Sequence, residues 1–118
     1  MTRALITAGA LDAGLAVAAG AFGAHALRGR LEPRALEIFE TAARYQMYHG
    51  LAILLCALIA TSGARIAGWV FQAGIVLFSG SLYALALSDV KWLGAITPIG
   101  GLAFLVGWVY LAVSALRP

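Results

Sequence analysis

Charged residues are scarce in this chain. Of its 118 residues only 11% are Asp, Glu, Lys or Arg, whereas 63% are hydrophobic. A soluble domain is about 25% charged and about half apolar, and a folded unit of this size cannot hide so much apolar surface from water. The composition therefore excludes a water-soluble monomer, and it excludes a disordered tail, whose chain must be polar. It indicates an integral membrane protein.

Cysteine is nearly absent as well. Cys56 is the only one, and a disulfide scaffold needs cysteines in pairs. The sequence also lacks a glycine-rich phosphate loop and a nucleophile elbow. We therefore expect no cofactor, no catalytic residue and no enzymatic activity, and we expect Cys56 to pack as a small apolar residue.

Four long apolar runs separate the charged residues. A helix needs about 20 apolar residues to cross a hydrocarbon core of about 30 Å. Only helices and closed barrels satisfy their backbone groups in lipid, and so few spans cannot close a barrel. We predict an all-α integral membrane four-helix bundle that forms a single domain, 1–118. The spans are predicted at about 5–26, 45–63, 66–88 and 97–116.

One polar segment interrupts this pattern. Seven of the thirteen charged residues lie between Leu27 and Tyr45. Pro33 suits the first turn of a helix, and apolar residues recur on one face of the segment, at Leu36, Phe39 and Ala43. This pattern predicts a short amphipathic helix at about 33–43, lying on the membrane surface between the first and second spans.

Basic residues in the loops predict the orientation. With four spans both termini share one side, which carries three basic residues, while the opposite side carries five. The three are Arg3, Arg65 and Arg117; the five are Arg28, Arg30, Arg34, Arg44 and Lys91. We expect the long loop in the cytoplasm and the termini outside. The net charge of +3 belongs to these loops, so no nucleic-acid partner is expected.

Small residues mark the predicted contacts between helices, because lipid-embedded helices associate where small side chains let backbones approach. The chain has 14 glycines. On the first span one face carries Asp12, Ala16, Ala19 and Gly23. On the fourth span one face carries Thr97, Gly100, Gly101, Gly107 and Ser114. A compact bundle accounts for these stripes without a ligand.

Asp12 is the one charged residue inside a predicted span. A carboxylate near the middle of a membrane costs at least about 2.5 kcal/mol to insert. One interpretation is structural, with a protonated or hydrogen-bonded carboxyl joining the first helix to Gln72 or Ser79 on the third. The other is functional, with an intramembrane carboxyl that takes and releases a proton. The sequence alone leaves both open.

A second set of polar residues gathers toward the long-loop side of the membrane. Counting along the spans places six candidates on that side: His25, Tyr45, Tyr48, His49, Tyr83 and Thr97. Two histidines on adjacent helices are a weak signal for a haem or a divalent metal. Histidines in such positions more often cap helix ends or hydrogen-bond to a neighbouring tyrosine. We regard this polar cluster as a candidate functional site without a metal.

Several short motifs carry a family resemblance. They are GAFGAH at 20–25, YQ at 45–46 followed by His49, FSGSLY at 78–83, and Gly94 followed by TP at 97–98 and GG at 100–101. Together they resemble the YgdD-like family of small membrane proteins, a bacterial domain family of unknown function. The resemblance covers nearly the whole chain and implies four membrane helices in the bacterial plasma membrane. It implies no activity, cofactor or catalytic residue, and Asp12 lies outside its motifs.

Two functions from different classes fit these features. The first is a structural or accessory protein of the membrane, with membrane lipids around it and with a second copy or a larger membrane complex as partner. The second is a small homo-oligomeric transporter or channel, in which Asp12 couples transport to protons and the polar cluster forms a gate. Small multidrug transporters have a similar size, a similar number of spans and a carboxylate in the first span. They use Glu and other surrounding motifs, so the likeness is an analogy only.

Overall fold

Four long helices make up almost the whole chain. The computed structural model describes residues 2–117, and it contains α1 (Thr2–His25), α2 (Pro33–Ile59), α3 (Ser62–Ser88) and α4 (Thr97–Ser114), with a short 3₁₀ helix, η1 (Lys91–Ala95), before α4. Between residues 2 and 117 there is no β-strand, and a single isolated bridge joins Arg28 to Leu31. The fold is all-α, as predicted.

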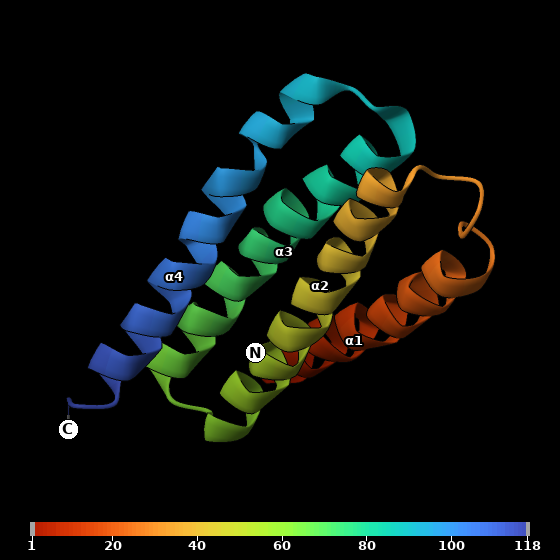
Figure 1. Cartoon of the computed structure of the whole chain (residues 1–118). Helices are drawn as coiled ribbons and strands as arrows, with labels where there is room; N and C mark the ends of the chain where they lie inside the picture. The colour runs from red at the N-terminus through yellow and green to blue at the C-terminus, as the bar shows by residue number, and fades with distance from the viewer. Residues whose placement is uncertain (1, 118) are drawn as a thin grey trace.

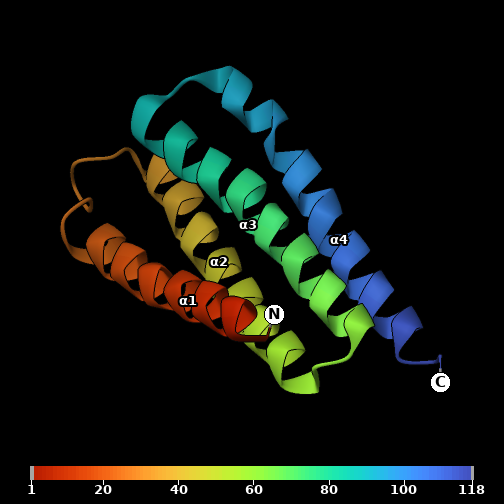
Figure 2. The ribbon, with the colours of Figure 1, turned by 180° about the vertical axis from the view of Figure 1, so that it is seen from behind.

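The helices lie side by side in chain order, each antiparallel to the next (Figures 1 and 2). α2 and α3 occupy the middle, α1 packs against α2, and α4 packs against α3. Both chain ends and the α2–α3 turn lie at one end of the molecule, while the loop after α1 and the η1 segment lie at the other (Figure 1). The principal extents are 52 × 26 × 17 Å.

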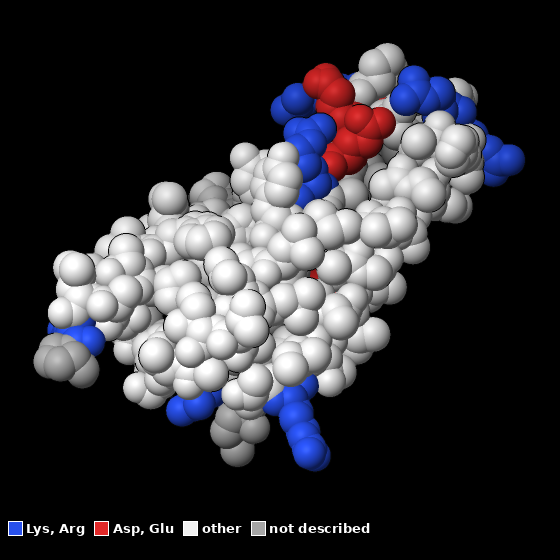
Figure 3. All heavy atoms as spheres, turned by 90° about the horizontal axis from the view of Figure 1, so that it is seen from below, with Lys and Arg blue, Asp and Glu red and all other residues white. Residues whose placement is uncertain are grey.

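Each of the four helical segments is long and apolar enough to cross a membrane, when η1 is counted with α4. At 1.5 Å per residue, helices of 24 to 27 residues exceed the roughly 30 Å of a hydrocarbon core. Figure 3 shows charged side chains gathered at the two ends of the molecule and a largely uncharged surface between them. The chain is therefore a multi-pass membrane protein.

The predicted amphipathic surface helix at 33–43 is wrong as a separate element. α2 runs without interruption from Pro33 to Ile59, so this segment is the first part of the second span. No proline or glycine between Pro33 and Gly50 breaks the helix. The apolar face of the segment is also covered by protein, because Phe39 packs 4.9 Å from the ring of Tyr83 on α3. The face that predicted a membrane contact therefore belongs to the core.

The turn between α2 and α3 is closed by local hydrogen bonds. Ala60 adopts a left-handed conformation with φ of 62°, and its N–H donates to the Cys56 carbonyl. The Thr61 side chain then accepts from the N–H of Ala64 at 3.1 Å. Such a C-cap followed at once by an N-cap leaves few unpaired backbone groups, and it makes α2 and α3 a tight antiparallel pair.

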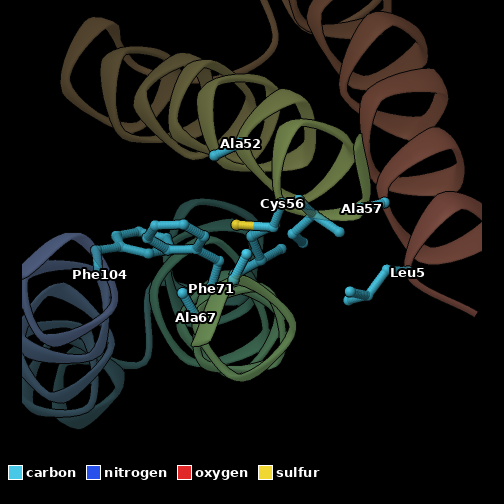
Figure 4. Packing of buried hydrophobic residues seen from close by; sticks show 10 residues of the cluster. Leu5, Ala52, Cys56, Ala57, Ala67, Phe71 and Phe104 are labelled. Carbon is cyan, nitrogen blue, oxygen red and sulfur yellow. The ribbon is translucent and has the colours of Figure 1, made fainter. Parts of the chain in front are cut away.

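The main core lies between α2 and α3 and is closed by one residue from each outer helix (Figure 4). Phe71, Ile53 and Cys56 are fully buried at its centre, with Leu5 of α1 on one side and Phe104 of α4 on the other. Cys56 packs as a small apolar residue, as expected. A second, smaller cluster toward the loop end contains Leu27, Phe39 and Ala86.

Small residues set the distances between helices. On α1 the predicted stripe is buried at Asp12, Ala16 and Gly23, while Ala19 is half-buried. On α4, Gly100 lies against the backbone of Phe78, where an added Cβ would stand 2.7 Å from the Phe78 Cα. The glycine therefore permits a close approach of α4 to α3.

Candidate functional site

Gln46 is the centre of the buried polar groups. It lies on α2 and is 6% exposed. Its Nε2 donates to the backbone carbonyl of Asp12 on α1 at 2.9 Å, and its Oε1 accepts from the hydroxyl of Tyr83 on α3 at 2.7 Å. One amide thus ties three helices together. In the sequence, Gln46 is visible as an amide inside an apolar span. We used it only as part of the family resemblance and did not include it in the candidate site.

Two further hydrogen bonds join neighbouring helices. The Ser79 hydroxyl on α3 donates to the Ala42 carbonyl on α2 at 2.8 Å. The hydroxyls of Ser81 on α3 and Thr97 on α4 lie 2.6 Å apart. Because lipid offers no competing partner to these groups, such bonds fix how the helices sit against each other.

His49 has both ring nitrogens engaged. Trp108 Nε1 donates to His49 Nε2 at 3.1 Å, and His49 Nδ1 lies 2.9 Å from the Tyr45 carbonyl. Since an indole N–H only donates, Nε2 must accept and Nδ1 must carry the hydrogen. The ring also stacks on Phe104 with 3.6 Å between centroids. This neutral imidazole has its one lone pair occupied, so a metal or haem would have to displace Trp108.

The structure divides the predicted polar cluster into separate groups. Tyr45 and Tyr48 lie beside each other, with 5.5 Å between ring centroids, and Tyr45 lies 6.3 Å from His49. Tyr83 instead bonds to Gln46, and Thr97 bonds to Ser81. His25 is exposed at the end of α1. The six residues do not form one site.

Asp12 is buried at the interface of α1 and α2. The residue is 8% exposed, and its side chain faces Gly50, where an added Cβ would meet the Asp12 Cβ at 3.1 Å. The Gln72 side chain on α3 lies beside the carboxyl. Within residues 2–117, two fully buried side-chain atoms have no hydrogen-bond partner, and they are Asp12 Oδ2 and Gln72 Oε1. Ser79, the other expected partner, bonds elsewhere.

Asp12 Oδ2 and Gln72 Oε1 cannot form a hydrogen bond with each other while Asp12 is charged. A carboxylate oxygen and an amide oxygen both accept, so neither can satisfy the other. A protonated Asp12 would carry a donor and would remove the cost of a buried charge. A charged Asp12 would instead accept from the N–H₂ group of Gln72, whose side chain lies beside it. Among residues 2–117, no three His, Cys, Asp or Glu side chains gather as a metal site.

Comparison with known proteins gives a consistent result. Residues 19–101 match the family described as "Protein of unknown function (DUF423)". A UPF0382 membrane protein of Staphylococcus epidermidis is 51% identical, over 98% of this chain and 97% of its own. The UPF0382 membrane protein YwdK of Bacillus subtilis is 44% identical, over 98% of each chain. No solved structure matches.

The expected membership of a small membrane-protein family of unknown function is confirmed, although these relatives bear the name UPF0382 rather than YgdD-like. The matched segment begins in the second half of α1 and ends at the fifth residue of α4. It therefore includes Gln46, His49, Ser79, Tyr83 and Thr97, and it leaves out Asp12. By both the family match and these full-length relatives, this chain belongs to the DUF423 family of membrane proteins, whose function is unknown.

Proposed function

We propose that this protein is a non-enzymatic structural or accessory component of the bacterial plasma membrane. The observation that carries the proposal is the use of the buried polar side chains. Gln46, Ser79 and His49 each bond to another helix. Groups held in this way position helices and are not free to bind or transform a substrate.

The outward surface supports the same proposal. The two outer helices expose large apolar side chains, for example Leu15 of α1 at 61% and Leu105 of α4 at 64%. In a membrane these faces meet lipid or another helix. We propose that one of them contacts a partner, which is a subunit of a larger membrane complex or a second copy of this chain.

Native mass spectrometry after mild extraction at natural abundance tests this proposal. We expect a reproducible complex with another membrane protein. Leu15→Trp and Leu105→Trp form a matched pair, since both residues are exposed and lie on opposite outer helices. One of them should release the partner while the other does not. A chain that is always recovered without another protein, and that neither substitution affects, would contradict an accessory role.

A proton-linked transporter or channel is the second candidate, and Asp12 Oδ2 favours it. This oxygen is buried in the middle of α1 without a partner, which is how an intramembrane proton carrier is placed. We expect proton-linked flux in liposomes to vanish in Asp12→Asn if the candidate is right. Ser79→Ala removes a buried hydrogen bond away from Asp12 and serves as control. Flux that persists in Asp12→Asn would rule out this candidate.

We also propose an orientation in which the loop after α1 faces the cytoplasm. The half of the molecule with this loop carries five basic residues, of which Arg34 and Arg44 lie on the first half of α2, against three toward the end with both termini. Positive charge is retained on the cytoplasmic side of short loops. The excess supports this orientation over its reverse.

A further inference from the structure

A groove opens between α1 and α3 toward the loop end of the molecule. It has a volume of about 580 Å³. Leu15, Ala18 and Phe22 of α1 form one wall, Tyr83 and Leu87 of α3 form the other, and Phe39 of α2 lies at the floor. Figure 1 shows the loop end of α1 set apart from α3, with α2 between them.

The groove is suited to an apolar chain. Its two polar lining side chains, Gln46 and Tyr83, are hydrogen-bonded to each other at 2.7 Å. The remaining lining is aliphatic or aromatic. Because the walls belong to membrane-spanning helices, the groove opens sideways into the hydrocarbon layer. A flexible hydrocarbon chain can enter it without breaking a hydrogen bond.

A charged pocket continues the groove at its loop end. Leu87 lines both, and the second pocket has a volume of about 340 Å³. Its charged lining consists of two cations and two carboxylates, namely Arg30, Lys91, Glu32 and Asp89. Lys91 and Asp89 bond to each other at 2.8 Å. Over residues 2–117, Arg30 and Glu32 are in no ion pair, so one cation and one anion are available to a ligand.

We propose that the groove and the charged pocket together bind one phospholipid with a zwitterionic headgroup. One acyl chain lies between α1 and α3, the phosphate lies at Arg30, and the headgroup ammonium lies at Glu32. A helix of a second copy is a less suitable occupant. Such a helix is about 10–12 Å across, and it would bring apolar side chains to this charged end. An apolar tail with a doubly charged head matches both parts. The site uses neither Asp12 nor the outer face of α4, so it stands with the transporter candidate and with an accessory protein whose partner contacts α4. It shares Leu15 with the outer face of α1, so a partner on that face would compete with the lipid.

Photo-crosslinking tests the site. The full-length protein is placed in vesicles of phosphatidylethanolamine and phosphatidylglycerol that contain phosphatidylethanolamine with a diazirine on one acyl chain. After irradiation, labelled peptides are located by mass spectrometry. We expect several-fold more label at Leu15, Phe22 and Leu87 than at Leu105 and Val109 of α4, which are at least as exposed. Equal labelling of both surfaces would overturn the site.

Substitutions separate the groove from general contact with lipid. Ala18 is exposed and lines the groove, so Ala18→Trp should fill the groove and reduce the label at Phe22 and Leu87 several-fold. Val109→Trp on α4 is the control and should leave it unchanged. Circular dichroism verifies that both variants fold. A folded Ala18→Trp variant with unchanged label would overturn the proposal.

Two more measurements test the identity of the occupant. The first measurement compares diazirine phosphatidylethanolamine with a second probe, diazirine phosphatidylglycerol. When Arg30→Ala and Glu32→Ala are combined, labelling by the first probe should fall to the level of labelling by the second. Equal labelling of the unsubstituted protein by both lipids would overturn the zwitterionic assignment. Ala18→Cys in a Cys56→Ser background tests whether a second copy of the chain occupies the groove. A disulfide-linked dimer would place another chain there and would overturn the proposal that the occupant is a lipid.

Discussion

Gln46 joins α1, α2 and α3 through the two ends of one amide group. An amide inside a membrane span is costly unless both ends are bonded, because lipid replaces neither bond. The two partners come from helices far apart in sequence. The residue type could be noticed from the sequence, but its partners could not, since they depend on how the three helices rotate against each other.

The bond between Gln46 and Tyr83 is measurable by a double-mutant cycle with Gln46→Ala and Tyr83→Phe. Hydrogen bonds between membrane helices contribute about 0.6 kcal/mol on average and up to about 1.7 kcal/mol. We expect a coupling free energy of unfolding within this range in mixed micelles. Tyr110→Phe on the exposed face of α4 should show none with Gln46→Ala. Independent effects at Gln46 and Tyr83 would show that the bond does not contribute.

Asp12 offers a second prediction at this scale. Asparagine has nearly the same shape as aspartate, carries no charge, and offers both a donor and an acceptor to the Gln72 side chain, which lies beside residue 12. We therefore expect Asp12→Asn to fold and to have a thermal midpoint equal to or above that of the unsubstituted protein. Asp12→Leu, which offers the Gln72 side chain neither a donor nor an acceptor, should lower it.

Thermal unfolding in a mild detergent, followed by circular dichroism, measures these midpoints. A clear loss of stability in Asp12→Asn would mean that the fold requires a charged carboxylate, in disagreement with a protonated Asp12. Retained stability also makes the flux experiment with this variant interpretable, because lost transport could not then be attributed to unfolding.

At the scale of helices, the sequence predicted the type and number of elements better than their limits. Length and hydropathy fix a membrane helix because lipid leaves the backbone no other choice. The segment 33–43 was misjudged, since an amphipathic pattern is the same whether its apolar face meets lipid or protein. Phe39 packs against Tyr83, a contact that depends on α3, which comes much later in the chain.

The approach of α4 to α3 at Gly100 gives a prediction for an element. A Cβ at Gly100 would meet the backbone of Phe78, which cannot turn aside as a side chain can. We expect Gly100→Ala to lower the free energy of unfolding by about 1–3 kcal/mol. Gly80→Ala is the matched control, since nothing lies within 4 Å of a Cβ there, and it should leave stability unchanged or slightly higher.

Chemical unfolding of both variants in mixed micelles distinguishes close packing from a general effect of glycine. If Gly100→Ala and Gly80→Ala change the free energy of unfolding by the same amount, α4 does not approach α3 as closely as Gly100 indicates. The stripe of small residues on α4 was visible in the sequence. The residue that it faces was not, because spacing along one helix does not give the rotation of its neighbour.

At the scale of the whole molecule, charge and apolar surface are separated along the long axis. Charged side chains occupy the two ends (Figure 3), and both termini lie at the same end (Figure 1). This separation is what a bilayer demands of a chain that crosses it four times. The sequence predicts it from the positions of charges alone, whereas the groove between α1 and α3 depends on the angle between the helices.

The orientation of the molecule is tested by cysteine labelling. In a Cys56→Ser background, Ser62→Cys lies at the end with the termini and Ala26→Cys lies at the end with the long loop; both positions are exposed. Because basic residues are retained in the cytoplasm, a membrane-impermeant maleimide should label Ser62→Cys in intact cells and should reach Ala26→Cys only after lysis. The reverse pattern would place the long loop outside. Labelling of both variants in intact cells would mean that the small excess of basic residues inserts the chain in both orientations.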